Sequence, residues 1–517
     1  MSVVQTTPCD QGEADLCSYR TFFEASGFET SIPLTVVNRN ELYQWASGKY
    51  PPHLALVPKN REVSQTELFN RLGLVEAAIM LQKIVPKNFI GRVSEGLLEK
   101  FKALLFGENY EGATFAALER NNSDLFRRHT ATDIMQGKNI GDHPDWWSDA
   151  KFAQQFLTGT NPTTVKHAGS LWIDRFRKAA EVQGEPGQAV ADLLRADNAD
   201  SFYVQDYSYF REAAHYGESG TFAEDAPMKA GTGGETKYCA APVVLFRLPE
   251  SGQLHPIAIV LDYKIDMAHS VTIFNKRLEA VDPNSTKALE QLEAEKNDWP
   301  WRYAKQVVQM ADWCLHEVIV HLTWTHLVEE ATIVAANRAF EVTHPVFRLL
   351  EPHWYRTLPI NAGARATLVP TIIFDLIGMS DEQPYNFIKY HYAKFDWTKR
   401  YIPADLESRG FPPKDLESKP KYKNYAYGRN MILMWDCIRA FVEEMLAVHY
   451  PHDSSVAEDE QIKAWYIECQ QNGQITGFPA IKTREELFDA CTMAIHIASP
   501  QHTAVNYLQN CESVMQW

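Results

Sequence analysis

Residues 316–326 read HEVIVHLTWTH, within a segment at 301–340 whose apolar residues recur at helical spacing. The motif places His316, His321 and His326 five residues apart along one apolar helix. Five residues of regular α-helix rotate the chain by about 500°, which leaves successive imidazoles roughly 140° apart. A π-bulge would widen the helix and bring residues five apart onto one face, and such bulges are frequent at functional sites. The competing interpretation is a row of buried histidines hydrogen-bonded to the backbone.

A second histidine motif lies near residue 500. The stretch SPQHTAVNYLQ places His502 and Asn506 four residues apart, on one face of a helical turn. Imidazole suits iron, manganese and zinc, and an asparagine amide oxygen is a hard, neutral donor. Three histidines and one asparagine would leave coordination positions open for a redox-active metal. Spacing alone leaves a structural role for these residues equally open.

Charge and composition restrict the class of protein. The 517 residues include 50 Lys and Arg against 66 Asp and Glu, which gives a net charge of −16. No dense basic run is present to neutralise phosphates, so nucleic acid is excluded as a bulk partner. Hydrophobic residues at 45% and charged residues at 22% are ordinary for a globular protein. No window of 18 residues is free of charge, so no transmembrane segment is expected.

Two further features bear on the cellular compartment. The opening residues, MSVVQTTPCDQGEADLCSY, lack the basic and apolar regions of a signal peptide. The eight cysteines are scattered without a CxxC pair, which fits neither a zinc ribbon nor a dense disulfide scaffold. Together these features predict a cytoplasmic protein with reduced thiols.

The pattern along the chain divides into three regions. Residues 1–85 are predicted to be a lead-in followed by helices, because helical spacing begins near Leu68. Residues 86–239 are predicted to be mostly helical, and residues 240–517 to form the metal-binding core. Helical spacing also recurs in two later segments, 429–449 and 484–498.

Two short motifs flank residue 240. The stretch VVLFRLPESGQLHPIAIVLDY, residues 243–263, is rich in β-branched residues around a glycine turn and predicts two short strands. The preceding AGTGGETK, residues 230–237, fails the phosphate-loop pattern because Tyr238 stands where that loop needs Ser or Thr after its lysine. We interpret it as a flexible surface loop.

Four blocks, in this order, resemble the lipoxygenase family. They read WRYAKQVVQMADWCLHEVIVHLTWTHLVEEATIVAANRAF, THPVFRLLEPHWYRTLPINAGAR, NYAYGRNMILMW and IASPQHTAVNYLQ. The resemblance is to the fungal kind of catalytic domain that lacks an N-terminal β-barrel. It covers about residues 240 to 510, with weaker similarity before them. It implies a mainly α fold, a large helical catalytic domain with small β-sheet elements.

The resemblance implies a metal site. His321, His326 and His502 match the family's histidine ligands, with Asn506 as a weak fourth ligand and His316 outside the ligand set. The implied cofactor is one non-haem iron, and the five-residue spacing of the first two ligands favours iron. Manganese is the alternative, because close fungal relatives use it.

Further positions match residues around the family's reacting centre. Glu317 stands where many members have a glutamine that hydrogen-bonds toward metal and substrate, and Gln509 matches the other glutamine of that network. Ala364 matches the small residue that governs the approach of oxygen, alanine being typical of S-stereospecific members; a packing role is the alternative. Leu368 and Ile373 resemble the aliphatic clamp around the reacting methylene. The family positions interpreted as structural are Glu330, Asn337, His344, Pro345 and Asn361.

The implied activity is that of a dioxygenase. Its partners would be dioxygen and a polyunsaturated fatty acid similar to linoleate, with hydrogen abstracted from a methylene between two double bonds and a hydroperoxide as product. Peripheral membrane contact is compatible with such a substrate, and the oligomeric state is left open.

The resemblance also leaves two alternatives. Lipoxygenases take a final ligand from a C-terminal Ile or Val carboxylate far beyond the asparagine, whereas this sequence ends 517 − 506 = 11 residues after Asn506. The expectation is therefore a truncated tail, which raises the alternative of a catalytically impaired protein that binds lipid or a partner. An oxygenase acting on another polyene in secondary metabolism is the other alternative.

Overall fold

The computed structural model describes residues 36–58, 61, 145–185, 187–217, 223–230, 236–281, 285–374, 377–380 and 382–506. The helix expected near Leu68 and most of the stretch AGTGGETK lie outside these residues.

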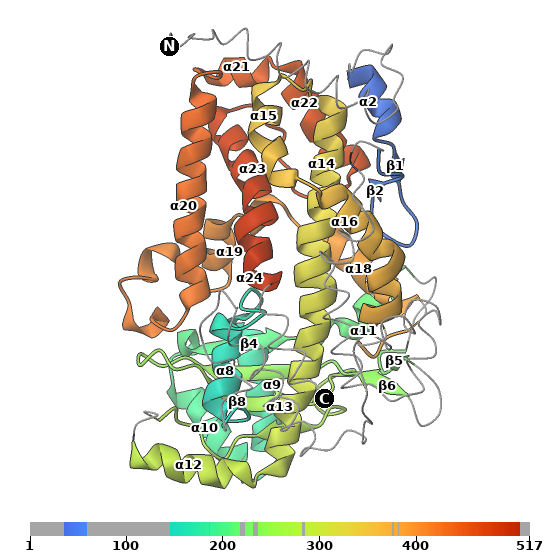
Figure 1. Cartoon of the computed structure of the whole chain (residues 1–517). Coiled ribbons are helices and arrows are strands. Elements are labelled where there is room, and N and C mark those ends of the chain that lie inside the picture. Colours follow the sequence, from blue (N-terminus) through green and yellow to red (C-terminus); the bar gives the residue numbers. More distant parts are fainter. Residues whose placement is uncertain are drawn as a thin grey trace, which may run out of the picture.

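One long helical element passes through the centre of the molecule, as the apolar segment 301–340 predicts (Figure 1). It consists of α13 (Trp299–Leu315), a π-helix η5 (His316–Leu327) and α14 (Val328–Ala339). Every residue from 328 to 337 is buried. A helix that is buried on all sides must be surrounded by other elements, so this element forms the axis of the core.

Several helices pack around this axis, and α20 pairs with α23 beside it (Figure 1). They are α2 (Val36–Leu42), α16 (Thr357–Gly363), α18 (Gln383–Lys394), α20 (Ala426–Ala447), α22 (Glu460–Ile467), α23 (Arg484–His496), the π-helix η12 (Ile497–Gln501) and α24 (His502–Asn506). The predicted helices at 429–449 and 484–498 correspond to α20 and α23. A capping box starts α23, because Thr483 Oγ1 accepts from the Glu486 amide while the Glu486 carboxylate accepts from the Thr483 amide.

A five-stranded antiparallel sheet lies at the lower end of Figure 1. Its strands, in spatial order, are β3 (Lys166–His167), β4 (Phe202–Asp206), β7 (Val243–Arg247), β8 (His255–Val260) and β9 (Thr272–Phe274). The strand pair predicted within residues 243–263 is confirmed as β7 and β8. Gly252 in their connection has φ 78°, and a Cβ there would lie 2.8 Å from the Pro420 carbonyl oxygen, so the turn requires glycine.

Alternation along the strands gives the sheet two buried faces. Val243 and Leu245 point to a cluster formed with α9 (Gly169–Glu181) and α10 (Gly187–Ala196). Val244 and Phe246 point to the main core cluster. Successive side chains of a strand face opposite sides, so β7 joins the sheet's outer helices to the helical core. The sheet also joins β3 and β4, which precede residue 240, to strands that follow it.

The remaining elements are short. Within the described residues, two further strand pairs are antiparallel: β1 (Trp45–Ala46) with β2 (His53–Leu54), and β5 (Met228–Ala230) with β6 (Lys237–Cys239). The other helices described are α8 (Asp149–Thr158), η3 (Ala199–Ser201), α11 (Phe210–Ala214), α12 (Thr286–Lys296), α15 (Pro345–Leu350), η6 (Glu351–Trp354), η7 (Ala364–Ile373), η8 (Thr398–Arg400), α19 (Ile402–Ser408), η9 (Pro413–Asp415), η10 (Pro420–Tyr422), α21 (Asp453–Ala457) and η11 (Glu468–Asn472). The fold is thus mainly α with small β elements, as expected.

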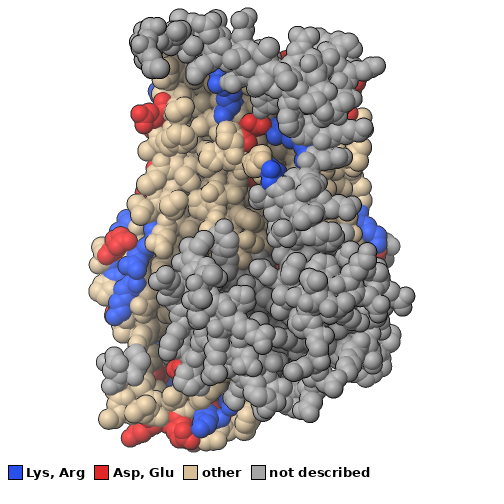
Figure 2. All heavy atoms as spheres, in the orientation of Figure 1, with Lys and Arg blue, Asp and Glu red and all other residues tan. Residues whose placement is uncertain are grey.

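Two surface properties follow from the described residues. Among their helices, none is both long enough and apolar enough to cross a bilayer. On the face drawn in Figure 2, the described Lys and Arg side chains stand in small groups, often beside Asp and Glu, without a broad basic patch.

Candidate metal centre

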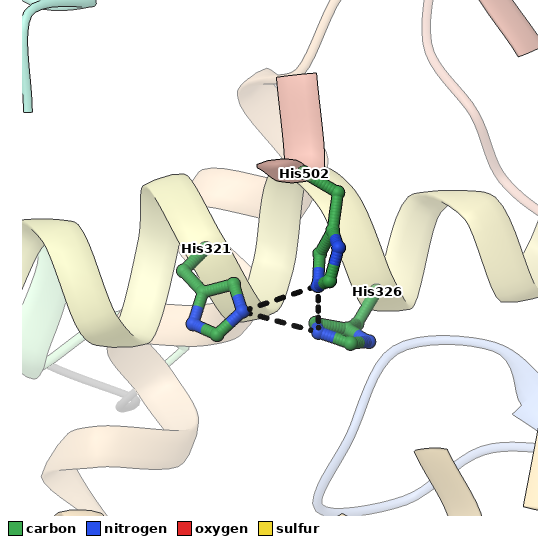
Figure 3. A group of neighbouring side chains, drawn as sticks. All are labelled: His321, His326 and His502. Atoms are coloured by element: carbon green, nitrogen blue, oxygen red, sulfur yellow. Dashed lines mark hydrogen bonds between the residues drawn. The ribbon is translucent and has the colours of Figure 1, made fainter. Parts of the chain in front are cut away.

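Three imidazoles converge beside the central helix (Figure 3). The Nε2 atoms of His321 and His326 are 3.2 Å apart, and His502 Nε2 lies 3.0 Å from His326 Nε2 and 3.4 Å from His321 Nε2. Among the described His, Cys, Asp and Glu side chains, these three form the one group close enough to hold an ion.

The π-helix explains how two of these histidines meet. The structure confirms the expected widening: η5 extends over His316–Leu327, and it places His321 and His326 on one face. A side-chain hydrogen bond has the same five-residue spacing as the π-helix: Thr323 Oγ1 donates to the Val318 carbonyl oxygen at 2.6 Å. The third histidine arrives from α24, which packs against η5.

The separations fit a metal with an open side. Imidazole nitrogens bind metals such as zinc at about 2.1 Å. Nε2 separations of 3.0–3.4 Å then correspond to angles of roughly 90–110° at a shared ion. Three ligands at such angles lie to one side of the ion, and the other side remains available for further ligands and reactants.

Burial keeps two of these imidazoles, those of His326 and His502, neutral. Desolvation, and then the neighbouring His321, lower the pKa of His326 to about 3. Desolvation, then His326 and His321, lower the pKa of His502 to about 2. A neutral imidazole has one nitrogen lone pair, and at neutral pH that lone pair is available to a cation. Three converging imidazole nitrogens, two of them from neutral rings, therefore fit a metal ion.

Asn361 on α16 fixes the tautomer of His326. Its Oδ1 lies 2.8 Å from His326 Nδ1, and its Nδ2 donates to the His326 carbonyl at 2.8 Å. An amide oxygen can only accept, so Nδ1 carries the proton and Nε2 keeps its lone pair toward the centre. The sequence resemblance gives Asn361 only a structural role; its contact with a residue 35 positions away has no local sequence signal.

Glu317 and His316 lie behind His321. The Glu317 carboxylate is 3.3 Å from His316 Nδ1 and 3.8 Å from His321 Nδ1. Burial acts to raise the Glu317 pKa, but the two nearby imidazoles outweigh it and lower the pKa to about 2. A carboxylate behind a ligating imidazole orients the ring and increases its basicity. His316 Nε2 also bonds the Val505 carbonyl at 2.8 Å, which ties η5 to α24 between His502 and Asn506.

The structure describes four of the other predicted positions. Asn506 ends α24 one turn after His502. Ala364 is buried at the start of η7, and Leu368 and Ile373 on the same helix pack against the main core cluster. Gln509 lies outside the described residues.

A buried ion pair positions the start of η7. The Arg365 guanidinium bonds the Glu330 carboxylate, which is fully buried on α14 and also accepts from the Leu54 amide at 3.0 Å. This pair links the turn that carries Ala364 to the helix that follows the metal-binding segment. The family resemblance marks Glu330 as structural but does not identify its partner.

Comparison with known proteins gives one consistent result. A sequence profile of the lipoxygenase family matches residues 230–512. A protein of Pleurotus sapidus named manganese lipoxygenase is 41% identical over 497 residues, which cover 94% of this chain and 72% of that protein. The linoleate 9/13-lipoxygenase of Pseudomonas aeruginosa is 30% identical over 366 residues, which cover 70% of this chain and 48% of the bacterial protein. The crystal structure of a fungal lipoxygenase from Fusarium graminearum superposes with a TM-score of 0.78 at 38% identity, covering 93% of this chain and 77% of that one.

Proposed function

Because this chain belongs to the lipoxygenase family of fatty acid dioxygenases, we propose that it inserts dioxygen into a linoleate-like polyunsaturated fatty acid at a metal held by His321, His326 and His502. The convergence of their Nε2 atoms within 3.4 Å supports this proposal. Asn506, one turn after His502, is the proposed weak fourth ligand.

The donor set accepts either iron or manganese. We propose iron as the resident ion, because the five-residue spacing of His321 and His326 resembles that of the iron members. The name of the Pleurotus relative makes manganese the alternative. Elemental analysis of the purified protein distinguishes the two directly.

The residues of this chain have three tasks in the reaction. When bound, the metal supplies the one-electron redox chemistry that the bis-allylic methylene requires. The three imidazoles would hold the ion, with those of His326 and His502 neutral, and Asn361 keeps the His326 lone pair aimed at it. We propose that Leu368 and Ile373 orient the methylene and that Ala364 leaves room for dioxygen on one side of the reacting chain. The buried surroundings exclude water from the substrate radical.

The test combines metal content with product formation. The purified protein should contain close to one equivalent of iron or manganese, and linoleate in air should produce the absorbance of a conjugated diene. His502→Gln should lose both metal and diene formation. His496→Gln is the matched control, because His496 is also buried near η12 but lies outside the ligand set. Metal without diene would favour the lipid-binding alternative, and protein without metal would contradict the proposed site.

A further inference from the structure

The helix that carries the third histidine is short and follows a π-helix that contains a proline. The described part of α24 is His502–Asn506, and the preceding η12 ends at Gln501. Pro500 lies inside η12, and proline has no amide hydrogen to donate within a helix. A helix of so few residues is not stable by itself. The position of α24, and of His502 with it, must therefore be set by contacts with other elements.

The ring of His502 is held differently from the other two imidazoles. Asn361 Oδ1 contacts the Nδ1 atom of His326 at 2.8 Å. The Glu317 carboxylate lies 3.8 Å from the Nδ1 atom of His321. Within the described residues, the hydrogen-bonding contacts of the His502 ring are those of its Nε2 atom with the other two imidazoles. In this part of the chain, its direction therefore depends on where the backbone of α24 lies.

Two hydrogen bonds from other elements hold the chain on either side of His502. The His316 Nε2 atom, on η5, bonds the Val505 carbonyl oxygen at 2.8 Å, three residues after His502. The Tyr427 hydroxyl, on α20, donates to Gln501 Oε1 at 2.7 Å, immediately before His502. Because α20 and η5 are separate helices, α24 is attached at its two ends to different parts of the core.

The bond between Tyr427 and Gln501 is shielded from water. Tyr427 is 8% exposed, and Gln501 is partly buried. The Tyr427 ring centroid lies 6.0 Å from that of Tyr425, and α20 packs against η12 at this level. Water does not readily replace a hydrogen bond in such surroundings. The bond can therefore restrain Gln501 and the histidine that follows it.

We propose that Tyr427 is a positioning residue of the metal centre: through its bond to Gln501, it sets where His502 presents its Nε2 atom to the ion. This inference rests on the proposed function, because it requires an ion held by the three histidines. Tyr427 acts through Gln501 and is not itself a ligand. Without this bond the start of α24 would be free to shift, and a displaced imidazole binds the ion less tightly and in a changed geometry.

Tyr427→Phe tests this role, and Tyr425→Phe is its matched control. The Tyr425 hydroxyl donates to the Pro162 carbonyl oxygen at 2.9 Å, and Tyr425 is 1% exposed. Each variant loses one hydrogen bond of a buried tyrosine, so both should lower the urea midpoint of unfolding by similar amounts. Only Tyr427→Phe should weaken the binding of Mn(II) to the metal-depleted full-length protein. The expected loss is about two- to tenfold, the effect of one neutral hydrogen bond, measured by calorimetric titration.

The electron paramagnetic resonance spectrum of bound Mn(II) gives a second measurement that does not depend on turnover. Its zero-field splitting reports the arrangement of the ligands around the ion. The spectrum should change in Tyr427→Phe and remain that of wild type in Tyr425→Phe. A change in both variants, or in neither, would overturn the role assigned to Tyr427.

A double-mutant cycle tests the route through Gln501. Gln501→Leu removes the acceptor from a partly buried position and should weaken Mn(II) binding as Tyr427→Phe does. If the two residues act through one bond, the double variant should bind Mn(II) no more weakly than either single variant. Additive losses would overturn the role of their hydrogen bond. Wild-type protein that binds no metal would contradict the proposed function itself, whereas equal Mn(II) affinity of wild type and Tyr427→Phe would overturn the positioning role alone.

Discussion

At the scale of single residues, the sequence points to the three converging histidines more clearly than to the groups that hold them. Spacing alone leaves a structural role for His321, His326 and His502 open, and it is their resemblance to the family's histidine motifs that predicts a ligand role. The partners of those histidines come from other elements, and a hydrogen bond between residues far apart in the chain has no periodicity to read. Asn361 is the clearest example, since family resemblance marks its position but not its contact with His326.

Replacing Asn361 by alanine should weaken metal binding. The change removes the acceptor at His326 Nδ1 and the donor to its carbonyl, so the ring loses its fixed tautomer and orientation. Loss of such a partner typically lowers metal affinity by about 10- to 100-fold. A metal titration followed by calorimetry measures the effect. Asn361→Asp keeps the acceptor and should lose less affinity; equal losses in both variants would contradict the role assigned to the amide oxygen.

Glu317→Gln tests the carboxylate behind His321. The substitution preserves shape but removes the negative charge that faces the Nδ1 atoms of His316 and His321. A less basic imidazole stabilises the oxidised metal less, so the reduction potential of the bound ion should become more positive. Spectroelectrochemical titration of the metal-loaded protein measures it. An unchanged or more negative potential would show that Glu317 does not act through His321.

At the scale of elements, the five-residue spacing predicts a π-bulge, and the structure contains a π-helix from His316 to Leu327. The π-helix is longer than the five-residue spacing predicts, and it packs against α18 and α24. The strand pair β7 and β8 was equally predictable, since both strands are rich in β-branched residues around a glycine turn.

A matched pair of threonines can separate the π register from ordinary helix stability. Thr323→Val removes the bond to the Val318 carbonyl five residues earlier, and Thr332→Val removes a bond to the Val328 carbonyl four residues earlier on α14. Both side chains are fully buried. Each loss should lower the free energy of unfolding by about 1–2 kcal/mol, measured by urea denaturation. Only Thr323→Val should also weaken metal binding. Equal metal affinity in both variants would show that the Thr323 hydrogen bond does not maintain the π-helical register.

At the scale of the whole molecule, helical spacing predicts a mainly α core, but not the contacts that join distant parts. Lys305 on α13 is buried between Asp149 of α8 and Glu295 of α12. No sequence pattern pairs residues 156 positions apart. Such buried charges persist only because the fold brings their partners to them.

Buried neutral histidines should make the metal-free protein sensitive to acid. Burial lowers the pKa of His496 to about 3, and the pKa values of His326, His391 and His502 are also lowered. The unfolded chain, with imidazole pKa values near 6.5, binds more protons than the folded chain below that pH. The contribution of these histidines to the free energy of unfolding is therefore fully present above about pH 6.5. It falls as the pH drops toward the pKa values of the folded protein, by up to about 1.4 kcal/mol per pH unit for each histidine.

A histidine variant separates the histidine contribution to the pH dependence of stability from that of buried carboxyl groups, whose protonation stabilises the folded state. Burial raises the pKa of Glu295 to about 8, so protonation of that group favours the folded state as the pH falls from 8 to about 4.5. Comparing wild type with His496→Gln cancels such shared contributions. Between pH 7.5 and 5.5, the free energy of unfolding of wild type should fall by about 1.4 kcal/mol more than that of the variant. Urea denaturation at the two pH values measures this difference, and parallel losses in the two proteins would mean that His496 is not held neutral by burial.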